Sequence, residues 1–274
     1  MKPASLALVA LLIAAASRSQ VLRRPVATAY TGLGAYSLHH TDVFSFSANQ
    51  ASLAQLTHAA AGVFGERRFL LQELNNYNAA MALPTSSGNF GLVAGYNGFT
   101  EYNETRLGLA YARKLGSRVD IGVQFNYNGI RIAGYGTASA ISVDAGTILH
   151  LSDVLHAGLH VSNPAGGKFG KDQQEKLPAI YTAGLGYEAS EKFFVSMEIM
   201  KEEDQPVNVN AGIQYKFLSS LLARAGISAA TSSAWLGIGV LWKTLRVDVA
   251  AGYHPQLGFT PGLLLIFNFK QKES

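Results

Sequence analysis

The side chains most suited to chemistry in this sequence are a few histidines and carboxylates. His156 and His160 are four residues apart, so a β-strand would place both on one face. A zinc ion would need a third ligand, for which Asp144 and Glu188 are the candidates. Alternatively, the two imidazoles make hydrogen bonds in the interior. We favour this reading because nothing in the sequence fixes a third ligand, and we expect no metal ion and no cofactor.

The sequence contains no pattern of a known catalytic site. His39, His40 and Asp42 form an unspecific group, which we assign to a plug or a loop. No nucleophile elbow, metal-binding helix or phosphate loop occurs. Glu66 and inward carboxylates such as Glu198 could be considered as a hydrolytic pair, but nothing fixes their separation. The chain has no cysteine, which excludes thiol catalysis and disulfides. We predict that the protein is not an enzyme.

The elements that must position these side chains are indicated by a strict alternation of apolar and polar residues. From Val119 to Asn128 every second residue is apolar, and a β-strand turns alternate side chains to opposite faces. The pattern recurs from about residue 59 onward in about fourteen segments, which is typical of a transmembrane β-barrel. The predicted strands lie near residues 59–69, 77–84, 89–98, 104–115, 118–131, 139–150, 154–162, 179–188, 192–200, 207–217, 221–228, 234–242, 245–253 and 262–270.

Composition agrees with an all-β protein of one domain. Of 274 residues, 48% are hydrophobic, 15% are charged and 28 are glycine, which suits many short strands better than helices. The net charge is +4, but the basic residues are scattered and form no patch interleaved with aromatic residues. We therefore expect no nucleic-acid partner.

The N-terminus has the features of a secretory signal. Lys2 precedes the apolar run Leu6–Ala16, small residues follow, and cleavage is expected before Gln20. The apolar run is shorter than the roughly 20 residues of a membrane-spanning helix. We divide the chain into a signal peptide, residues 1–19, an N-terminal plug segment, residues 20–58, and an outer-membrane β-barrel, residues 59–274.

The connections between predicted strands suggest an orientation. Tight turns such as Gly116-Ser117 and Ser219-Ser220 alternate with longer connections such as Asn163–Leu177. Outer-membrane barrels have short periplasmic turns and longer external loops. We therefore expect the Asn163–Leu177 loop to face outward, with Lys168, Phe169 and Lys171 as its candidate contact residues.

The alternation also predicts which side chains point into the lumen. Charges of both signs lie on the inward parity, and an unpaired buried charge is costly, so we expect them to pair with each other or with the plug in a filled barrel. The predicted polar lumen residues are Arg106, Asp120, Asp144, His156, His160, Glu188, Glu198, Arg224, Arg246 and Asp248.

Several stretches resemble a known family. Asn49-Gln50-Ala51 resembles the Asn-Pro-Ala stretch of the FadL-like superfamily, with Gln50 in place of the proline. The closer match lies in the second half of the chain and points to a PorV/PorQ-like outer-membrane family within that superfamily. It rests on Asn163-Pro164, Leu177-Pro178, Gly184-Leu185-Gly186-Tyr187, Ala211-Gly212-Ile213, Arg224-Ala225-Gly226-Ile227 and Tyr253-His254-Pro255-Gln256-Leu257-Gly258.

The resemblance implies a fourteen-stranded up-and-down barrel with an N-terminal plug, embedded in outer-membrane lipid. For the secretion-associated members it implies binding of cargo proteins or secretion-system subunits in type IX secretion. The alternative is a FadL-like transporter of hydrophobic small molecules across the outer membrane. The secretion role is our first expectation, because the predicted lumen is rich in charge, whereas a carrier needs a continuous apolar pocket with a few polar anchors.

Overall fold

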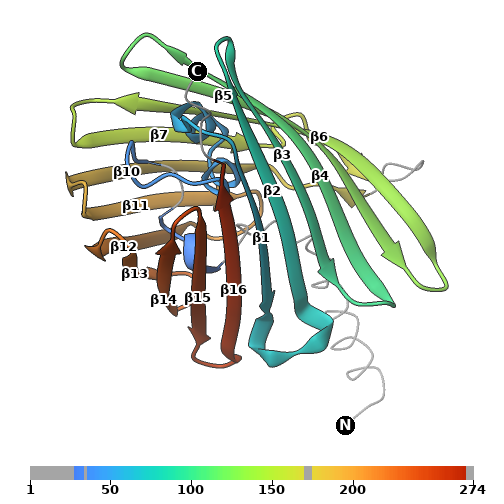
Figure 1. Ribbon diagram of the computed structural model, residues 1–274. Coiled ribbons are helices and arrows are strands. Elements are labelled where there is room, and N and C mark those ends of the chain that lie inside the picture. The colour runs from blue at the N-terminus through green and yellow to red at the C-terminus, as the bar shows by residue number, and fades with distance from the viewer. Residues whose placement is uncertain (1–27, 34–35, 170–174, 270–274) are drawn as a thin grey trace.

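The computed structural model describes residues 28–33, 36–169 and 175–269. The predicted signal peptide, residues 1–19, and the first residues of the predicted plug segment lie outside this part of the chain. Within it, no helix is long and apolar enough to span a membrane. Fourteen antiparallel strands close into a barrel (Figure 1).

The barrel confirms the predicted fold class, and each predicted strand is present with its ends shifted by a few residues. The reason is that alternation fixes which residues can sit on a two-faced sheet. The strands are β1 Ala60–Arg67, β2 Asn75–Thr85, β3 Gly88–Gly98, β4 Tyr102–Leu115, β5 Val119–Ile132, β6 Gly136–His150, β7 Leu155–Ser162, β10 Ile180–Ser190, β11 Phe193–Glu202, β12 Asn208–Leu218, β13 Leu221–Ser228, β14 Ser233–Trp242, β15 Leu245–His254 and β16 Gly258–Asn268.

Neighbours along the chain are neighbours in the sheet, and the first strand pairs with the last. Pairing of β1 with β16 runs from Ala60 opposite Asn268 to Glu66 opposite Gly262. β7 pairs directly with β10, because β8 (Lys168–Phe169) and β9 (Glu175–Lys176) form a separate two-stranded hairpin within the loop that joins them. Closure leaves no edge strand, as a barrel in lipid requires.

The outer surface of the barrel is apolar. Leu109, Phe125 and Val249 are 58%, 59% and 61% exposed, and they belong to strands spread around the ring. Such a surface is stable in lipid and unfavourable in water. The protein is therefore an integral outer-membrane barrel.

The two ends of the barrel differ. One end, here called the turn end, carries short connections such as Ser219-Ser220 between β12 and β13 and Lys243-Thr244 between β14 and β15. The other end, here called the loop end, carries the remaining connections, including the long one between β7 and β10 that contains the β8–β9 hairpin. Strands β4, β5 and β6 extend furthest toward the loop end (Figure 1).

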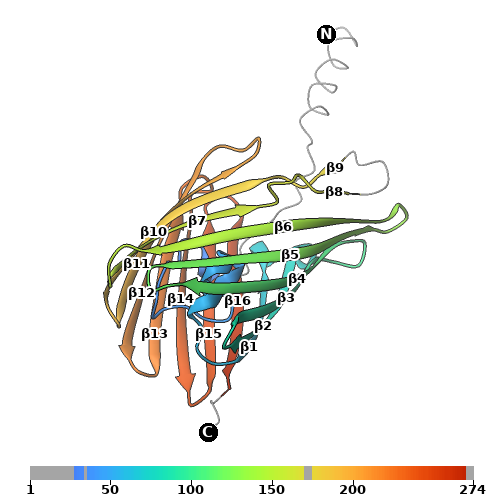
Figure 2. The same ribbon diagram turned by 90° about the horizontal axis from the view of Figure 1, so that it is seen from above.

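The plug, here the described residues between Thr28 and Leu56, lies inside the ring of strands (Figure 2). It contains three short 3₁₀ helices, η1 Thr28–Tyr30, η2 Ser45–Ser47 and η3 Gln50–Gln55. Two further 3₁₀ turns, η4 Arg68–Leu70 and η5 Gln72–Leu74, join β1 to β2. The largest apolar cluster of buried residues joins the plug to the inner wall and includes Val43, Phe44, Phe46, Leu53, Phe64, Val93, Leu264 and Ile266.

Glycines on the inner wall let the plug approach the strands closely. A Cβ atom at Gly158 on β7 would lie 2.5 Å from Cε1 of Tyr36, and one at Gly122 on β5 would collide with the backbone of Gln50. A side chain at either position would therefore push the plug away from the wall. Glycines that face inward, between apolar residues that face outward, line the part of the wall against which the plug packs.

Candidate functional site: the plugged lumen and its vestibule

Asp42 of the plug is held by two arginines of the wall. Its Oδ2 accepts a hydrogen bond from Arg246 Nη2 at 2.9 Å and lies 3.5 Å from Arg224 Nη2. The Tyr30 hydroxyl donates to the same oxygen at 2.6 Å, and Asp248 lies 2.7 Å from Arg246. Burial raises the pKa of Asp42, but Arg246, Arg224 and the hydrogen bonds from Tyr30 and the Phe44 N–H together lower it by more, so the pKa lies below its ordinary value. Two carboxylates balance two guanidinium groups here.

Glu188 on β10 holds the plug at a second point. Its Oε1 accepts from the Ser37 hydroxyl and from the backbone N–H groups of Leu38 and His39, the last at 3.2 Å. Its Oε2 lies 2.6 Å from His39 Nδ1. A buried carboxylate is tolerated when donors surround it in this way.

A third contact between the plug and the wall joins Gln55 to Asp120, and two histidines lie next to Asp120. Gln55 donates to the carboxylate of Asp120, which lies 2.9 Å from His150 Nε2. His150 Nδ1 is in turn 3.0 Å from His156 Nδ1. The Gln55 side-chain nitrogen also lies 3.0 Å from His150 Nε2, so Gln55, Asp120 and the two imidazoles form one polar cluster. The imidazoles thus make hydrogen bonds within the lumen.

Asp144 and Arg106 form an ion pair on the wall itself. Arg106 Nη2 lies 2.8 Å from Asp144 Oδ2, and Asn126 Nδ2 donates to the same oxygen at 2.9 Å. Ser162 donates to the other oxygen at 2.7 Å. Glu198 on β11 accepts from Asn210 Nδ2 at 2.9 Å. All these residues lie inside the barrel, on the inward parity read from the sequence.

His156 and His160 do not come together with Asp144 and Glu188 as a metal site. Among the residues that the structure describes, no three His, Asp or Glu side chains are arranged to hold a metal ion. His156 belongs to the base of the lumen, with its Nε2 4.0 Å from Glu188 Oε1, whereas His160 lines the space at the loop end.

The Asn49-Gln50-Ala51 stretch begins helix η3 and ties it to the wall. Asn49 is the N-cap, and its Oδ1 accepts from the Ala51 N–H at 3.0 Å. Its Nδ2 donates to the carbonyls of Thr147 and Leu159, each at 3.2 Å. Gln50 is fully buried, and neither atom of its side-chain amide has a hydrogen-bond partner among the described residues. Proline would suit this first helical position.

Lys168 and Phe169, two of the candidate contact residues of the Asn163–Leu177 loop, differ in their exposure to solvent. Lys168 is exposed. Phe169 is only 4% exposed and packs with Ile130 and Leu177, so it is not offered to a partner protein. Strand β8 lies beside β6, and the aromatic ring packs with Ile130 of β5 and Ala140 of β6. Lys171 lies outside the described residues.

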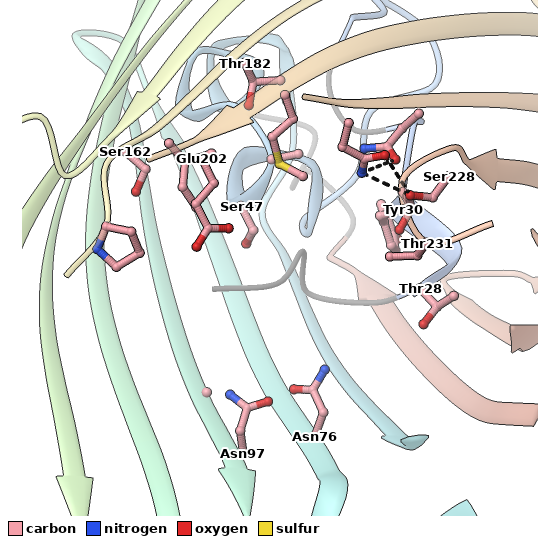
Figure 3. Close-up of a pocket in the computed structure, with 18 of the residues that line it drawn as sticks. Thr28, Tyr30, Ser47, Asn76, Asn97, Ser162, Thr182, Glu202, Ser228 and Thr231 are labelled. Carbon is pink, nitrogen blue, oxygen red and sulfur yellow. Dashed lines mark hydrogen bonds between the residues drawn. The ribbon is translucent and has the colours of Figure 1, made fainter. Parts of the chain in front are cut away.

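A cavity of about 520 Å³, here called the vestibule, occupies the lumen at the loop end. Its floor is formed by plug residues Thr28, Tyr30 and Ser47. Figure 3 shows these three side chains together with side chains from strands on opposite walls, such as Asn76 and Ser228. The plug therefore separates the vestibule from the turn end.

Amides and hydroxyls line part of the vestibule wall, although the larger part of its exposed surface is apolar. Neighbouring groups pair with each other: Asn78 donates to Asn76 at 2.6 Å, and Asn128 donates to Ser142 at 3.0 Å. The polar lining residues of this kind are Asn76, Asn78, Asn97, Thr105, Asn128, Ser142, Ser162, Asn163, Thr182, Asn208, Asn210, Ser228, Ser233 and Thr260.

These asparagines and hydroxyls were missed in the sequence, where only charges and histidines were selected as lumen residues. A usable signal exists: asparagines recur two positions apart at the loop end of a strand, at Asn76 and Asn78 in β2 and at Asn208 and Asn210 in β12. That spacing puts both side chains on the inward face.

Comparisons with known proteins identify relatives of the fold only. No family model and no curated protein matches the chain. Among solved structures, the chain is similar to the CymD monoaromatic hydrocarbon channel, at a TM-score of 0.66 and 11% identity, over 90% of this chain and 97% of that one. It is also similar to the Pseudomonas putida toluene transporter TodX, at 0.65 and 10%, over 90% and 97%. The Ralstonia pickettii toluene transporter TbuX matches at 0.63 and 10%, over 90% and 98%.

Proposed function

We propose that the protein is a non-enzymatic channel that admits small molecules from the loop end of an outer-membrane barrel. The observation that carries this proposal is the vestibule, a cavity of about 520 Å³ inside the lumen. That volume falls in the range of pockets for small ligands, roughly 300–1,000 Å³. The similarity to hydrocarbon channels supports the proposal at the level of the fold.

This proposal replaces our first expectation. Nothing in the comparisons supports a PorV/PorQ-like role in type IX secretion, whereas the solved channels favour the FadL-like alternative. The burial of Phe169 also removes an aromatic residue from the surface that a partner protein would contact.

The route through the barrel is set by the plug. Each of the fourteen strands is hydrogen-bonded to both neighbours, so a molecule in the vestibule reaches the turn end by passing the plug. The ion pairs at Asp42 and the hydrogen bonds at Glu188 keep that route closed at rest. Passage then requires these contacts to loosen.

An uptake experiment with a filled vestibule tests the proposal. Ser228 is buried on the vestibule wall, so Ser228→Trp should occupy the cavity, whereas Ser219→Trp at an exposed turn should not. Proteoliposomes would be placed in a solution of small aromatic solutes, and the uptake of the solutes would be measured. We expect uptake by the wild type and by Ser219→Trp, and a loss of uptake in Ser228→Trp. Equal uptake in all three proteins and in empty liposomes would refute the proposal.

A further inference from the structure

We infer that a second cavity, at the turn end of the barrel, binds the phosphate group of an anionic phospholipid. This cavity, here called the basin, has a volume of about 740 Å³. It is bounded by the end of the plug, the β2–β3 turn and the ends of β4 and β16. The inference goes beyond the proposed channel function and does not depend on it. It is carried by the charge of the basin, its hydroxyl groups, its apolar floor and its place on the barrel.

The charged groups that line the basin are basic. Arg113 and Lys114, at the end of β4, both line it and are both exposed. Among the described residues, the lining contains no Asp or Glu side chain, and neither Arg113 nor Lys114 forms an ion pair. Asp120 stands opposite Lys114 in the sheet, but it is buried and paired with His150. The two basic side chains therefore offer their charge to an anion from outside the chain.

Hydroxyl groups lie beside these basic side chains. Thr57, between the plug and β1, and Ser86 and Ser87, in the β2–β3 turn, line the basin and are exposed. Hydroxyls, ammonium groups and guanidinium groups all donate hydrogen bonds, and a planar guanidinium group can donate to two phosphate oxygens at once. The lining thus supplies charged and neutral donors for one phosphate group.

The floor of the basin is apolar and fixed in place. Ala54 and Leu56 of the plug and Ala112 of β4 are buried and line it. Asn89 of β3 holds the plug at this point, since its Nδ2 donates to the carbonyls of Leu53 and Leu56 at 2.7 and 2.8 Å. An apolar floor below a basic rim suits a lipid, whose phosphate carries apolar chains, better than it suits free phosphate.

The basin lies where the barrel meets the lipid headgroups. Phe217, Trp242 and Phe267 are exposed near the turn ends of β12, β14 and β16. Phe269 follows β16 and lines the basin, and its ring centre lies 4.9 Å from that of Phe267. Exposed aromatic residues form girdles at the membrane–water interfaces of outer-membrane barrels. Because a residue of this girdle borders the basin, the headgroups of the adjoining leaflet are within its reach.

The charge of the whole turn end also favours an anionic lipid. Basic residues outnumber acidic ones among the exposed residues that the structure describes at this end. The basic ones are Arg113, Lys114, Arg118, Lys192 and Lys243, and the acidic ones are Asp153 and Glu191. Basic clusters at a membrane surface attract anionic headgroups.

Native mass spectrometry of the detergent-solubilised protein tests the inference. Phosphatidylglycerol, which is anionic, would be compared with phosphatidylcholine of the same acyl chains, which carries no net charge. We expect phosphatidylglycerol to bind roughly 25-fold more tightly, since each basic residue near an anionic headgroup contributes about fivefold.

Matched variants link this preference to the basin. Arg113→Gln combined with Lys114→Gln should abolish the preference for phosphatidylglycerol. Lys192→Gln combined with Lys243→Gln removes two exposed basic residues of the same end that do not line the basin, and this variant should retain the preference. Heat-modifiability on a gel would confirm that each variant is a folded barrel.

Replacing ammonium acetate by ammonium phosphate at equal ionic strength distinguishes a lipid headgroup from free phosphate. The bound lipid should stay in place, and its displacement by inorganic phosphate would overturn the assignment to a lipid. Equal binding of the two lipids, or an equal loss of preference in the two double variants, would overturn the inference as a whole. The channel proposal would stand in each case, because it concerns the vestibule at the other end of the barrel.

Discussion

Asp42→Ala should unseat the plug while leaving the barrel intact. Asp42 is buried and meets Arg246 at 2.9 Å and Arg224 at 3.5 Å. Its removal leaves Asp248 as the one carboxylate paired with these two guanidinium groups among the described residues. Breaking a buried ion pair by removing one partner costs about 3–5 kcal/mol. At about 1.4 kcal/mol per tenfold change, the seated state should lose roughly two to four powers of ten in its population relative to the unseated one.

Single-channel recording in planar bilayers measures this change. The wild type should conduct rarely, and Asp42→Ala should show frequent or larger openings, because the plug no longer fills the lumen. Asp153→Ala, at an exposed turn, is the matched control and should behave as the wild type. Equal conductance in Asp42→Ala and the wild type, with both barrels folded, would refute the assignment of Asp42 as an anchor of the plug.

Acid should have the same effect as the substitution, and the sign follows from the lowered pKa of Asp42. The stabilisation is fully present above the unfolded-state pKa, near 3.8, and is lost as the pH falls through the lower folded-state value. Conductance should therefore rise only below about pH 4. A rise between pH 5 and 7 would point to another group.

Three further predictions test the seat of the plug and the orientation of the barrel. Gln50→Met removes two buried amide atoms that lack a partner among the described residues. It should therefore raise the free energy of unfolding by about 1–3 kcal/mol in urea titrations. A lower free energy of unfolding would contradict the unpaired state of this amide. Gly122→Leu should open the channel because its side chain collides with the Gln50 backbone, whereas Gly237→Ala, whose Cβ would lie 3.3 Å from Ala250 Cβ, should not. In this cysteine-free chain, Lys168→Cys should react with an impermeant maleimide on intact cells and Ser117→Cys should not; reversed labelling would invert the orientation.

The sequence by itself determined the barrel. Strict alternation, as in Val119–Asn128, leaves one face apolar and the other polar, and its repetition in about fourteen segments is typical of a closed sheet in lipid, which satisfies both faces and every backbone group. Asp120, Glu188 and Arg224 have the inward parity, and all three are buried in the structure. These features are local, because the direction of a strand side chain depends only on its position in the strand.

Tertiary structure alone decided what the lumen contains. The fold brings Asp42 to Arg224, 182 residues away, and Glu188 to Ser37, 151 residues away, and no local pattern encodes such a pairing. Phe169 reads as an exposed loop residue in the sequence, yet it is buried and packs with Ile130 and Leu177. The vestibule lies between described plug residues and strands on opposite walls, an arrangement that depends on packing between segments far apart in the chain.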